Sequence, residues 1–150
     1  MTTDIVRWCL AAPGLTSATL VTQLEFARKH SGDYGRWSKL TVGEWPWTAL
    51  RLGPKIARTS FHPVPRVDAA VLHLERRATP LLPGATRADY RALVEIGFAG
   101  TGGCLTASLR RRFPAKAVRR ACAAAGIPEG VPVGYVPPDA WVILFRYLAR

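Results

Sequence analysis

The stretch TSFHPVPRVDAAVLHLERR, residues 59–77, joins a proline-rich loop directly to a strand-forming run. Pro63 and Pro65 fix the backbone angle φ and lack amide donors, so this loop can join neither a helix nor a central strand. The run over residues 67–75 carries aliphatic side chains that can reach both faces of a strand, which is typical of a strand inside a sheet covered by helices. We therefore expect a stiff loop followed by a buried strand in an α/β fold.

Phe61 is the residue of this loop that points to a function. Its ring is flanked in sequence by Arg58 and Arg66, an arrangement that suits stacking on an unpaired base while the guanidinium groups bind phosphates. Pro63 and Pro65 would support this base-holding loop by stiffening it. The alternative is an ordinary loop in which Phe61 caps the core, because an aromatic residue beside prolines more often packs than binds. The sequence leaves both interpretations open.

The composition favours a globular protein with a polyanionic partner. The 150 residues are 49% hydrophobic and 21% charged, enough for one domain or a domain fragment with a small appendage. The formal charge of +11 and the isoelectric point near 10.6 indicate nucleic acid as the simplest partner. A GC-rich genome would explain why only 4 of the 21 basic residues are lysines, but it would not explain why acids number only 10.

Cysteine and histidine usage predicts neither a disulfide framework nor a metal site. The three cysteines form no C-x-x-C pair, and the three histidines lie on different segments without the spacing of metal ligands. Near the start, the apolar residues 8–15 are interrupted by Pro13 and Gly14 and follow no strongly basic leader. This argues against a signal peptide or a membrane span. We expect a cytoplasmic protein.

Residues 1–78 alternate between helical and strand patterns. The first expected element is a helix that Thr2 or Thr3 caps, with Asp4 in its first turn, and that runs to a stop at Pro13 and Gly14. The others, in chain order, are a strand over 18–22, a helix over 23–30, a turn over 31–37, a short helix over 38–45, and a strand over 47–56 interrupted at Gly53 and Pro54. With the strand over 67–75, this predicts that the first half is α/β.

After Arg77 the composition changes, and we place a domain boundary near residue 79. Pro80, Pro83 and Gly84 form a linker, and the segment 79–150 carries four helical stripes. The first begins with a capping box in which Thr86 precedes Asp89 by three residues. The stripes comprise Tyr90, Leu93, Val94, Gly97 and Phe98; Leu105, Leu109 and Phe113; Val118, Ala121, Cys122 and Ala125; and Trp141, Leu144, Phe145 and Leu148. Residues 127–138, which are rich in proline, are expected to be extended.

A basic cluster lies where the second and third stripes meet. Six positive charges fall within eleven residues without an acid among them: Arg110, Arg111, Arg112, Lys116, Arg119 and Arg120. If each bound a phosphate, affinity for nucleic acid would fall about 10³-fold between 50 and 200 mM salt. The alternative is a solvated helical face, although carboxylate partners at helical spacing are missing from the run.

The motifs occur in an order that resembles the erythromycin-resistance (Erm) rRNA adenine methyltransferases. They are QLEFARKHSGDYGRWSKLTV at 23–42, the pair Trp45-Pro46, F-x-P-x-P-x-V-D at 61–68, and AAVLHLERR with the following PLLP. The small-subunit rRNA dimethyladenosine transferases are similar more distantly. The resemblance is strongest over residues 20–83 and continues more weakly to the end.

The resemblance implies methyl transfer from S-adenosylmethionine to N6 of an adenine in large-subunit rRNA, which confers macrolide, lincosamide and streptogramin B resistance. In such enzymes a flipped adenine is held between two aromatic residues, and Phe61 matches the one from the F-x-P-x-P loop. The other belongs to an N-I-P-Y-type motif, whose asparagine positions the amine for attack. Residues 1–78 would then be the C-terminal portion of a Rossmann-like methyltransferase domain, and residues 79–150 a helical RNA-binding domain.

The chain also departs from the family pattern. It contains no asparagine, no D-P-P-Y substitute and no G-x-G after a first strand, so the amine-positioning element and the cofactor turn are both missing. Because residues 1–10 resemble the helix after the N-I-P-Y motif, we expect a C-terminal half that arises by truncation, by an internal start or by division into two chains. We expect the chain to be inactive alone, and we assign no catalytic, cofactor-binding or metal-binding residue to it.

Two other functions remain open. One is a stand-alone RNA-binding module that performs no chemistry; the other is DNA base methylation, which the order of motifs disfavours. Either way, a piece of a doubly wound sheet exposes edges and apolar faces that are normally covered. We therefore expect self-association or marginal folding.

Overall fold

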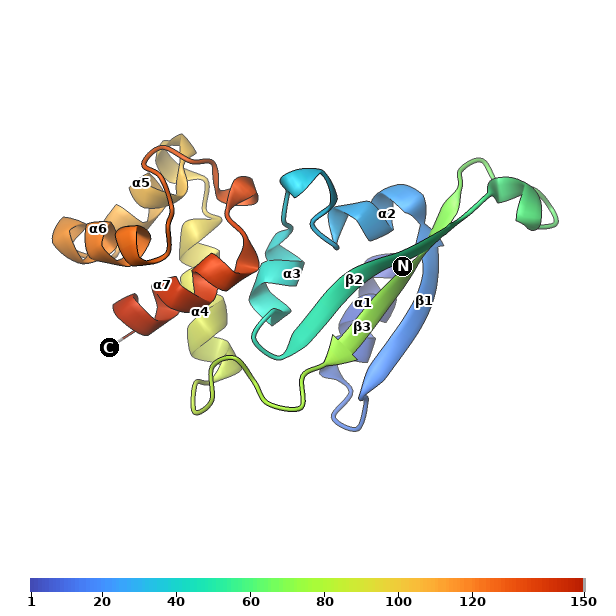
Figure 1. The fold of residues 1–150 in the computed structure, drawn as a ribbon, viewed down its shortest axis with the longest axis horizontal. Coiled ribbons are helices and arrows are strands. Elements are labelled where there is room, and N and C mark those ends of the chain that lie inside the picture. The colour runs from blue at the N-terminus through green and yellow to red at the C-terminus, as the bar shows by residue number, and fades with distance from the viewer. Residues whose placement is uncertain (150) are drawn as a thin grey trace.

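The first half of the protein is built on an antiparallel sheet with the strand order β1-β3-β2. The structure, a computed structural model, describes residues 1–149, apart from the side chain of Thr101. The strands are β1 (Ser17–Gln23), β2 (Thr48–Ile56) and β3 (Ala69–Arg76). Figure 1 shows this sheet beside a group of helices along the long axis of the molecule.

The predicted strand over 67–75 is confirmed as β3, the central strand. Leu72 of β3 lies opposite Leu20 of β1 and Leu52 of β2. The predicted interruption of β2 is a register shift between Leu52 and Lys55. At this point a Cβ on Gly53 would lie 2.9 Å from the Cβ of Val71, so the close approach of the two strands requires glycine.

Helices cover one face of this sheet. They are α1 (Thr2–Ala11) and α2 (Leu24–Lys29), and α3 (Lys39–Glu44) follows next to them. The buried residues of this sheet core are Val6, Cys9, Leu10, Ala27, Leu50, Ala70, Leu72 and Leu74. Because they join α1 and α2 to the same side of β3, burial of their apolar surface stabilises this half by the hydrophobic effect.

The opposite face of the sheet is open among the described residues. Val21 of β1 is exposed, and Val71 and His73 of β3 are only partly buried. The expectation of a strand covered on both faces was therefore wrong for this side. This face is open because α1 and α2 both pack on the face of the sheet that carries Leu72.

The start of α1 also differs from the prediction. The N-cap is Met1, without a side-chain hydrogen bond, and Thr2 already belongs to the helix. The amides of Asp4 and Ile5 both donate to the carbonyl of Met1, at 3.1 Å. The backbone thus closes the first turn without the expected threonine cap.

The second half contains four helices in the described residues, as predicted. They are α4 (Arg87–Gly97), α5 (Leu105–Arg110), α6 (Ala115–Ala124) and α7 (Pro138–Leu148). The predicted capping box is confirmed, because the Asp89 amide donates to the Thr86 hydroxyl over 3.1 Å. The predicted extended stretch over 127–138 is interrupted by a short 3-10 turn, η4 (Val133–Tyr135).

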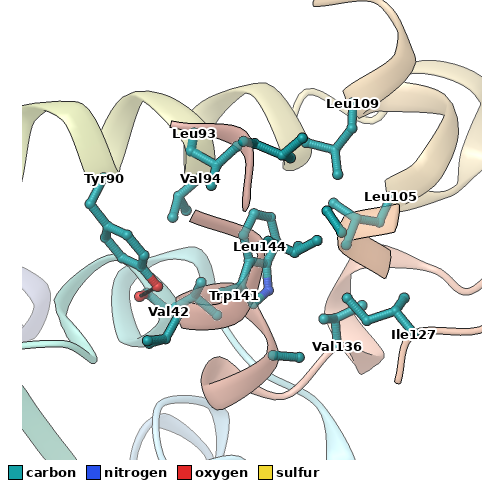
Figure 2. Close-up of a cluster of buried hydrophobic side chains, with 14 of the residues drawn as sticks. Val42, Tyr90, Leu93, Val94, Leu105, Leu109, Ile127, Val136, Trp141 and Leu144 are labelled. Carbon is teal, nitrogen blue, oxygen red and sulfur yellow. Dashed lines mark hydrogen bonds between the residues drawn. The ribbon is translucent and has the colours of Figure 1, made fainter. Parts of the chain in front are cut away.

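Trp141 lies at the centre of the helical core, among Val94, Leu105 and Leu144 (Figure 2). It is fully buried, and its ring stacks on Phe98 at a centroid distance of 5.5 Å. A Cβ on Gly97 would lie 2.3 Å from the Trp141 ring. Close packing of α4 against α7 therefore depends on the glycine at this position.

The two halves are joined through α3. Val42 and Trp47 belong to the helical core, and the Tyr90 hydroxyl donates to the Val42 carbonyl over 3.0 Å. The buried carboxylate of Glu44 pairs with Arg87, at 2.8 Å, and with Arg91. The domain boundary near residue 79 stays a prediction, since these contacts cross it. None of the described helices combines the length and the apolar character that a membrane crossing requires.

Candidate nucleic-acid interface

The segment between β2 and β3, residues 57–68, projects from the end of the sheet (Figure 1); we call it the base loop. Asp68 closes it, because its carboxylate accepts the Arg58 amide at 2.9 Å and pairs with Lys55 at 3.0 Å. The Arg58 amide and then the Lys55 ammonium lower the pKa of Asp68 below its usual value. The Asp68 carbonyl accepts the amide of Leu24, the first residue of α2, at 3.0 Å. These contacts anchor both ends of the loop to the sheet.

Phe61 sits on this anchored loop, outside both hydrophobic cores. It follows the 3-10 turn η2 (Arg58–Ser60), and its amide donates to the Arg58 carbonyl at 3.2 Å. Its ring is partly exposed and belongs neither to the sheet core nor to the helical core, nor to the side chains packed against them. Pro63 and Pro65 beyond it are exposed. The ring is thus presented on the loop, and its role in base stacking stays a prediction.

Arg58 and Arg66 meet at the base of the loop. The Arg58 guanidinium donates to the Arg66 carbonyl at 3.3 Å. Both arginines, with Gln23, Leu24 and Asp68, line an open pocket of about 390 Å³. The structure therefore brings together the two cations that the sequence places on either side of Phe61, and a phosphate could bind both.

The six residues of the basic cluster are all exposed where α5 ends and α6 begins. Arg110 pairs with Glu129 at 2.9 Å, a partner that the sequence run did not reveal. Among residues 1–149, the other five carry no ion pair with a carboxylate: Arg111, Arg112, Lys116, Arg119 and Arg120. An uncompensated charge of this kind attracts phosphates.

The base loop and the basic cluster lie at opposite ends of the long axis (Figure 1). Between them, along one edge of the molecule, lie α2, the 3-10 turn η1 (Asp33–Gly35) and the segment that contains η4. Sequence reasoning assigned only turn structure to η1. The structure shows that Tyr34 and Arg36 are both exposed there. The run Gly-Asp-Tyr-Gly-Arg-Trp, residues 32–37, was the one signal in the sequence that could have indicated an exposed tyrosine and arginine.

Comparison with known proteins identifies the family. The family model "Ribosomal RNA adenine dimethylase" matches residues 1–150. The chain belongs to this family. The family resemblance inferred from the motifs is thereby confirmed.

Two relatives cover nearly the whole of this chain. The chain is 55% identical to an rRNA methyltransferase of Streptomyces thermotolerans, over 98% of its length and 49% of the relative's. It is 53% identical to an rRNA adenine N-6-methyltransferase of Streptomyces fradiae, over 98% of its length and 46% of the relative's. The chain thus spans about half the length of the curated relatives it matches.

A solved structure supports the fold. The crystal structure of the 23S rRNA methyltransferase ErmE matches 99% of this chain and 61% of that one, with a TM-score of 0.93 and 50% identity. The predicted fold class, a portion of a methyltransferase α/β sheet followed by helices, is therefore confirmed.

Proposed function

We propose that this chain is the RNA-recognising part of an rRNA adenine N6-methyltransferase that modifies large-subunit rRNA and confers macrolide, lincosamide and streptogramin B resistance. The observation that carries this proposal is the match over 99% of the chain to a 23S rRNA methyltransferase at 50% identity. A mycinamicin-resistance protein of Micromonospora griseorubida, 35% identical over 97% of this chain, supports the resistance role.

The base loop supplies the first contact in this proposal. The Phe61 ring stacks on the unpaired target adenine, and Arg58 and Arg66 bind the phosphates beside it. Its presentation outside both cores supports this role. The anchoring of the loop through Asp68 favours it too, because a ring held on a stiff support loses little freedom when a base stacks on it.

The basic cluster supplies the second contact. Its five cations that have no carboxylate partner within residues 1–149, and Arg110 beside Glu129, bind the phosphate backbone away from the target base. Binding at both ends of the long axis would fix the orientation of the RNA, while the base loop selects the nucleotide.

The family implies S-adenosylmethionine as methyl donor, but the described residues do not fit this group. The described sheet contains only antiparallel pairs, whereas nucleotide-type cofactors bind at the carboxyl ends of parallel strands, beside a glycine-rich turn. β1 is followed directly by α2 without a glycine. No step is therefore assigned to the cofactor within these residues.

The second candidate function is an RNA-binding module without chemistry. The observation that favours it is that the exposed cations of the basic cluster and the partly exposed ring of Phe61 need no cofactor to contact RNA. Calorimetric titration of the chain with S-adenosylmethionine and a radiolabelled methyl-transfer assay on 23S rRNA test it. Cofactor binding and methyl transfer by the chain alone would contradict the module. The absence of both would support it.

RNA binding tests the proposed function itself. The chain should bind an rRNA hairpin with an unpaired adenine more tightly than a DNA duplex of equal length, and six phosphate contacts predict an affinity loss of about 10³-fold between 50 and 200 mM salt. Anisotropy titrations at several salt concentrations measure both quantities. Equal affinity for the DNA duplex would contradict the proposal, and tighter binding to the duplex would favour DNA as the substrate.

A further inference from the structure

The loop that contains η1 presents a tyrosine in an unusual backbone conformation. Tyr34 has a φ of +63° and is the one non-glycine residue with positive φ among the described residues. Its side chain is 66% exposed. Arg28 lies over its ring, 5.0 Å from the centroid, and donates to its hydroxyl. Residues held in sparsely populated conformations cluster at functional sites.

A rigid support lies under this loop. Gly32 also has a positive φ, of +77°, and a Cβ there would lie 2.2 Å from the ring of Trp37. Trp37 therefore packs directly over the backbone of Gly32, which only glycine permits. The Trp37 amide donates to the carbonyl of Gly134 at 2.8 Å. This bond joins the loop of η1 to the loop of η4, from the other half of the molecule.

A second tyrosine and arginine pair stands at this joint. Tyr135 of η4 is 47% exposed, and the Arg36 guanidinium donates to its hydroxyl at 2.7 Å. The guanidinium carbon lies 5.1 Å from the ring centroid. Each of Tyr34 and Tyr135 thus has an arginine on its ring and keeps about half or more of its surface free.

The charges of the two pairs differ. Arg28 is compensated by Asp33, at 3.1 Å, and by Glu25, at 3.7 Å. Arg36 pairs with no carboxylate among residues 1–149, and its described partner is the neutral Tyr135 hydroxyl. Arg36 therefore remains available to an anion, as does exposed Lys29 of α2, which also has no carboxylate partner among residues 1–149.

A pocket of about 360 Å³ opens at the joint. It is lined by Tyr34, Arg36, Trp37 and Gly134, by Asp33 and Ser38, and by Glu25, Arg28 and Lys29 of α2. Tyr135 does not line it but stands beside it through its contact with Arg36. This volume lies within the range of pockets that hold small molecules. It combines aromatic rings, which stack on any base, with the Arg36 guanidinium, which pairs with no described carboxylate and can bind phosphate.

We propose that this junction, formed by Tyr34, Arg36, Trp37 and Tyr135, is a second nucleotide-binding site that holds one unpaired nucleotide of the RNA. The base stacks on Tyr135 or Tyr34, and Arg36 binds the adjoining phosphate. The junction lies between the base loop and the basic cluster along one edge of the molecule (Figure 1), so an RNA that reaches both passes over it. This inference rests on the proposed function and adds to it a specificity site outside the base loop.

The test measures binding of the chain to a fluorescein-labelled rRNA hairpin with an unpaired adenine and single-stranded flanks. Tyr135→Ala should weaken binding about 5- to 100-fold, as should Tyr34→Asn, which removes the ring but tolerates positive φ. Tyr135→Phe keeps the ring and loses the hydroxyl, so near-parental affinity is expected. Arg36→Gln should reduce the slope of log affinity against log salt by about 0.7 to 0.9.

The matched control is Tyr147→Ala, because Tyr147 is a tyrosine of almost equal exposure, 48%, near the end of α7. Arg51→Gln on β2 controls for the loss of one exposed arginine. Both controls should bind RNA within twofold of the parent. A hairpin with 2-aminopurine at the flanking position reports stacking directly, because a tyrosine ring that stacks on this base quenches its fluorescence. Tyr135→Ala should abolish the quenching and Tyr135→Phe should retain it, a pattern that a purely structural role of Tyr135 would not produce.

The outcomes separate the two proposals. If Tyr135→Ala and Tyr34→Asn bind within twofold of the parent while Phe61→Ala is weakened, the junction site is wrong and the proposed function stands. If the parent chain binds no RNA, both are wrong. If Tyr135→Ala lowers the melting temperature, the test rests on the affinity of Tyr34→Asn and on the 2-aminopurine quenching with Tyr135→Phe. An affinity loss of Tyr34→Asn no larger than that of Tyr147→Ala would then overturn the site.

Discussion

The base loop and the helical core are each stabilised by different interactions. In the base loop, two prolines and the contacts of Asp68 fix the backbone, while the Phe61 ring stays outside the cores. In the helical core, Trp141 is fully buried and stacks on Phe98. The difference teaches that the molecule separates the residues proposed to bind RNA from those that stabilise the fold. Substitutions can therefore change one property while sparing the other.

The largest expected effect on stability is in the helical core. Trp141→Ala should lower the free energy of unfolding by about 3 to 5 kcal/mol, because it leaves a cavity where α4, α5 and α7 meet. Urea denaturation followed by circular dichroism measures the loss. Trp8→Ala, which removes a tryptophan that is 71% exposed, is the control and should change the value by less than about 0.5 kcal/mol. Equal losses for the two variants would contradict the packing described for Trp141.

Acidification should act on the sheet half through His30. Its side chain is buried, and its Nδ1 lies 2.8 Å from the Ser38 hydroxyl oxygen. Burial, and then the positive charge of Lys29, lower the pKa of His30 from 6.5 to about 4. The folded state thus disfavours the proton that the unfolded state accepts, so stability falls as the pH drops from 6.5 towards 4, by up to about 3 kcal/mol.

Denaturant titrations of the parent and of His30→Gln between pH 7 and pH 4 measure this contribution. The variant should show a shallower decline over that window, because carboxylates titrate in both proteins and cancel in the comparison. Parallel declines would mean that the buried imidazole makes no such contribution.

Much of the fold could be predicted from local sequence signals. The apolar run of β3 and the Thr86 capping box act within a few residues, and both were confirmed. The N-cap at Met1 was missed because a backbone carbonyl replaced the expected threonine side chain. The open face of the sheet was missed because strand periodicity shows which side chains share a face, but not what packs on it.

The site was less predictable because its contacts join distant residues. The sequence placed Arg58 and Arg66 around Phe61, and the structure brings the two arginines to one pocket. It did not reveal that Glu129 reaches Arg110. Nor did it indicate that Arg36 meets Tyr135 across 99 residues of chain, since nothing in a local pattern specifies a contact between two loops.

The base loop should respond in the opposite way to the helical core. Phe61→Ala should weaken binding to an rRNA hairpin with an unpaired adenine by about 1 to 3 kcal/mol if the ring stacks on the base. The free energy of unfolding should change by less than about 0.5 kcal/mol, because Phe61 belongs to neither core. Phe98→Ala, which removes the ring stacked on Trp141, is the reciprocal control and should lose mainly stability. A Phe61 variant that loses stability instead of affinity would restore the view that this ring caps the core.

The smallest effect on stability is expected in the basic cluster, where the change should appear in the salt dependence instead. Replacing Arg110, Arg111 and Arg112 together by glutamine should reduce the slope of log affinity against log salt by about 2 to 3 if each binds a phosphate. Arg110 also pairs with exposed Glu129, but surface ion pairs contribute about 0 to 1 kcal/mol, so the fold should tolerate its loss. Anisotropy titrations between 50 and 200 mM salt measure the slope, with Arg51→Gln as the single-charge control. An unchanged slope in the triple variant would mean that the solvated-face interpretation is correct and that the RNA binds its phosphates elsewhere. A reduced slope with unchanged stability would show that RNA binding and folding depend on different residues, because the exposed cations that bind RNA are not needed by the core.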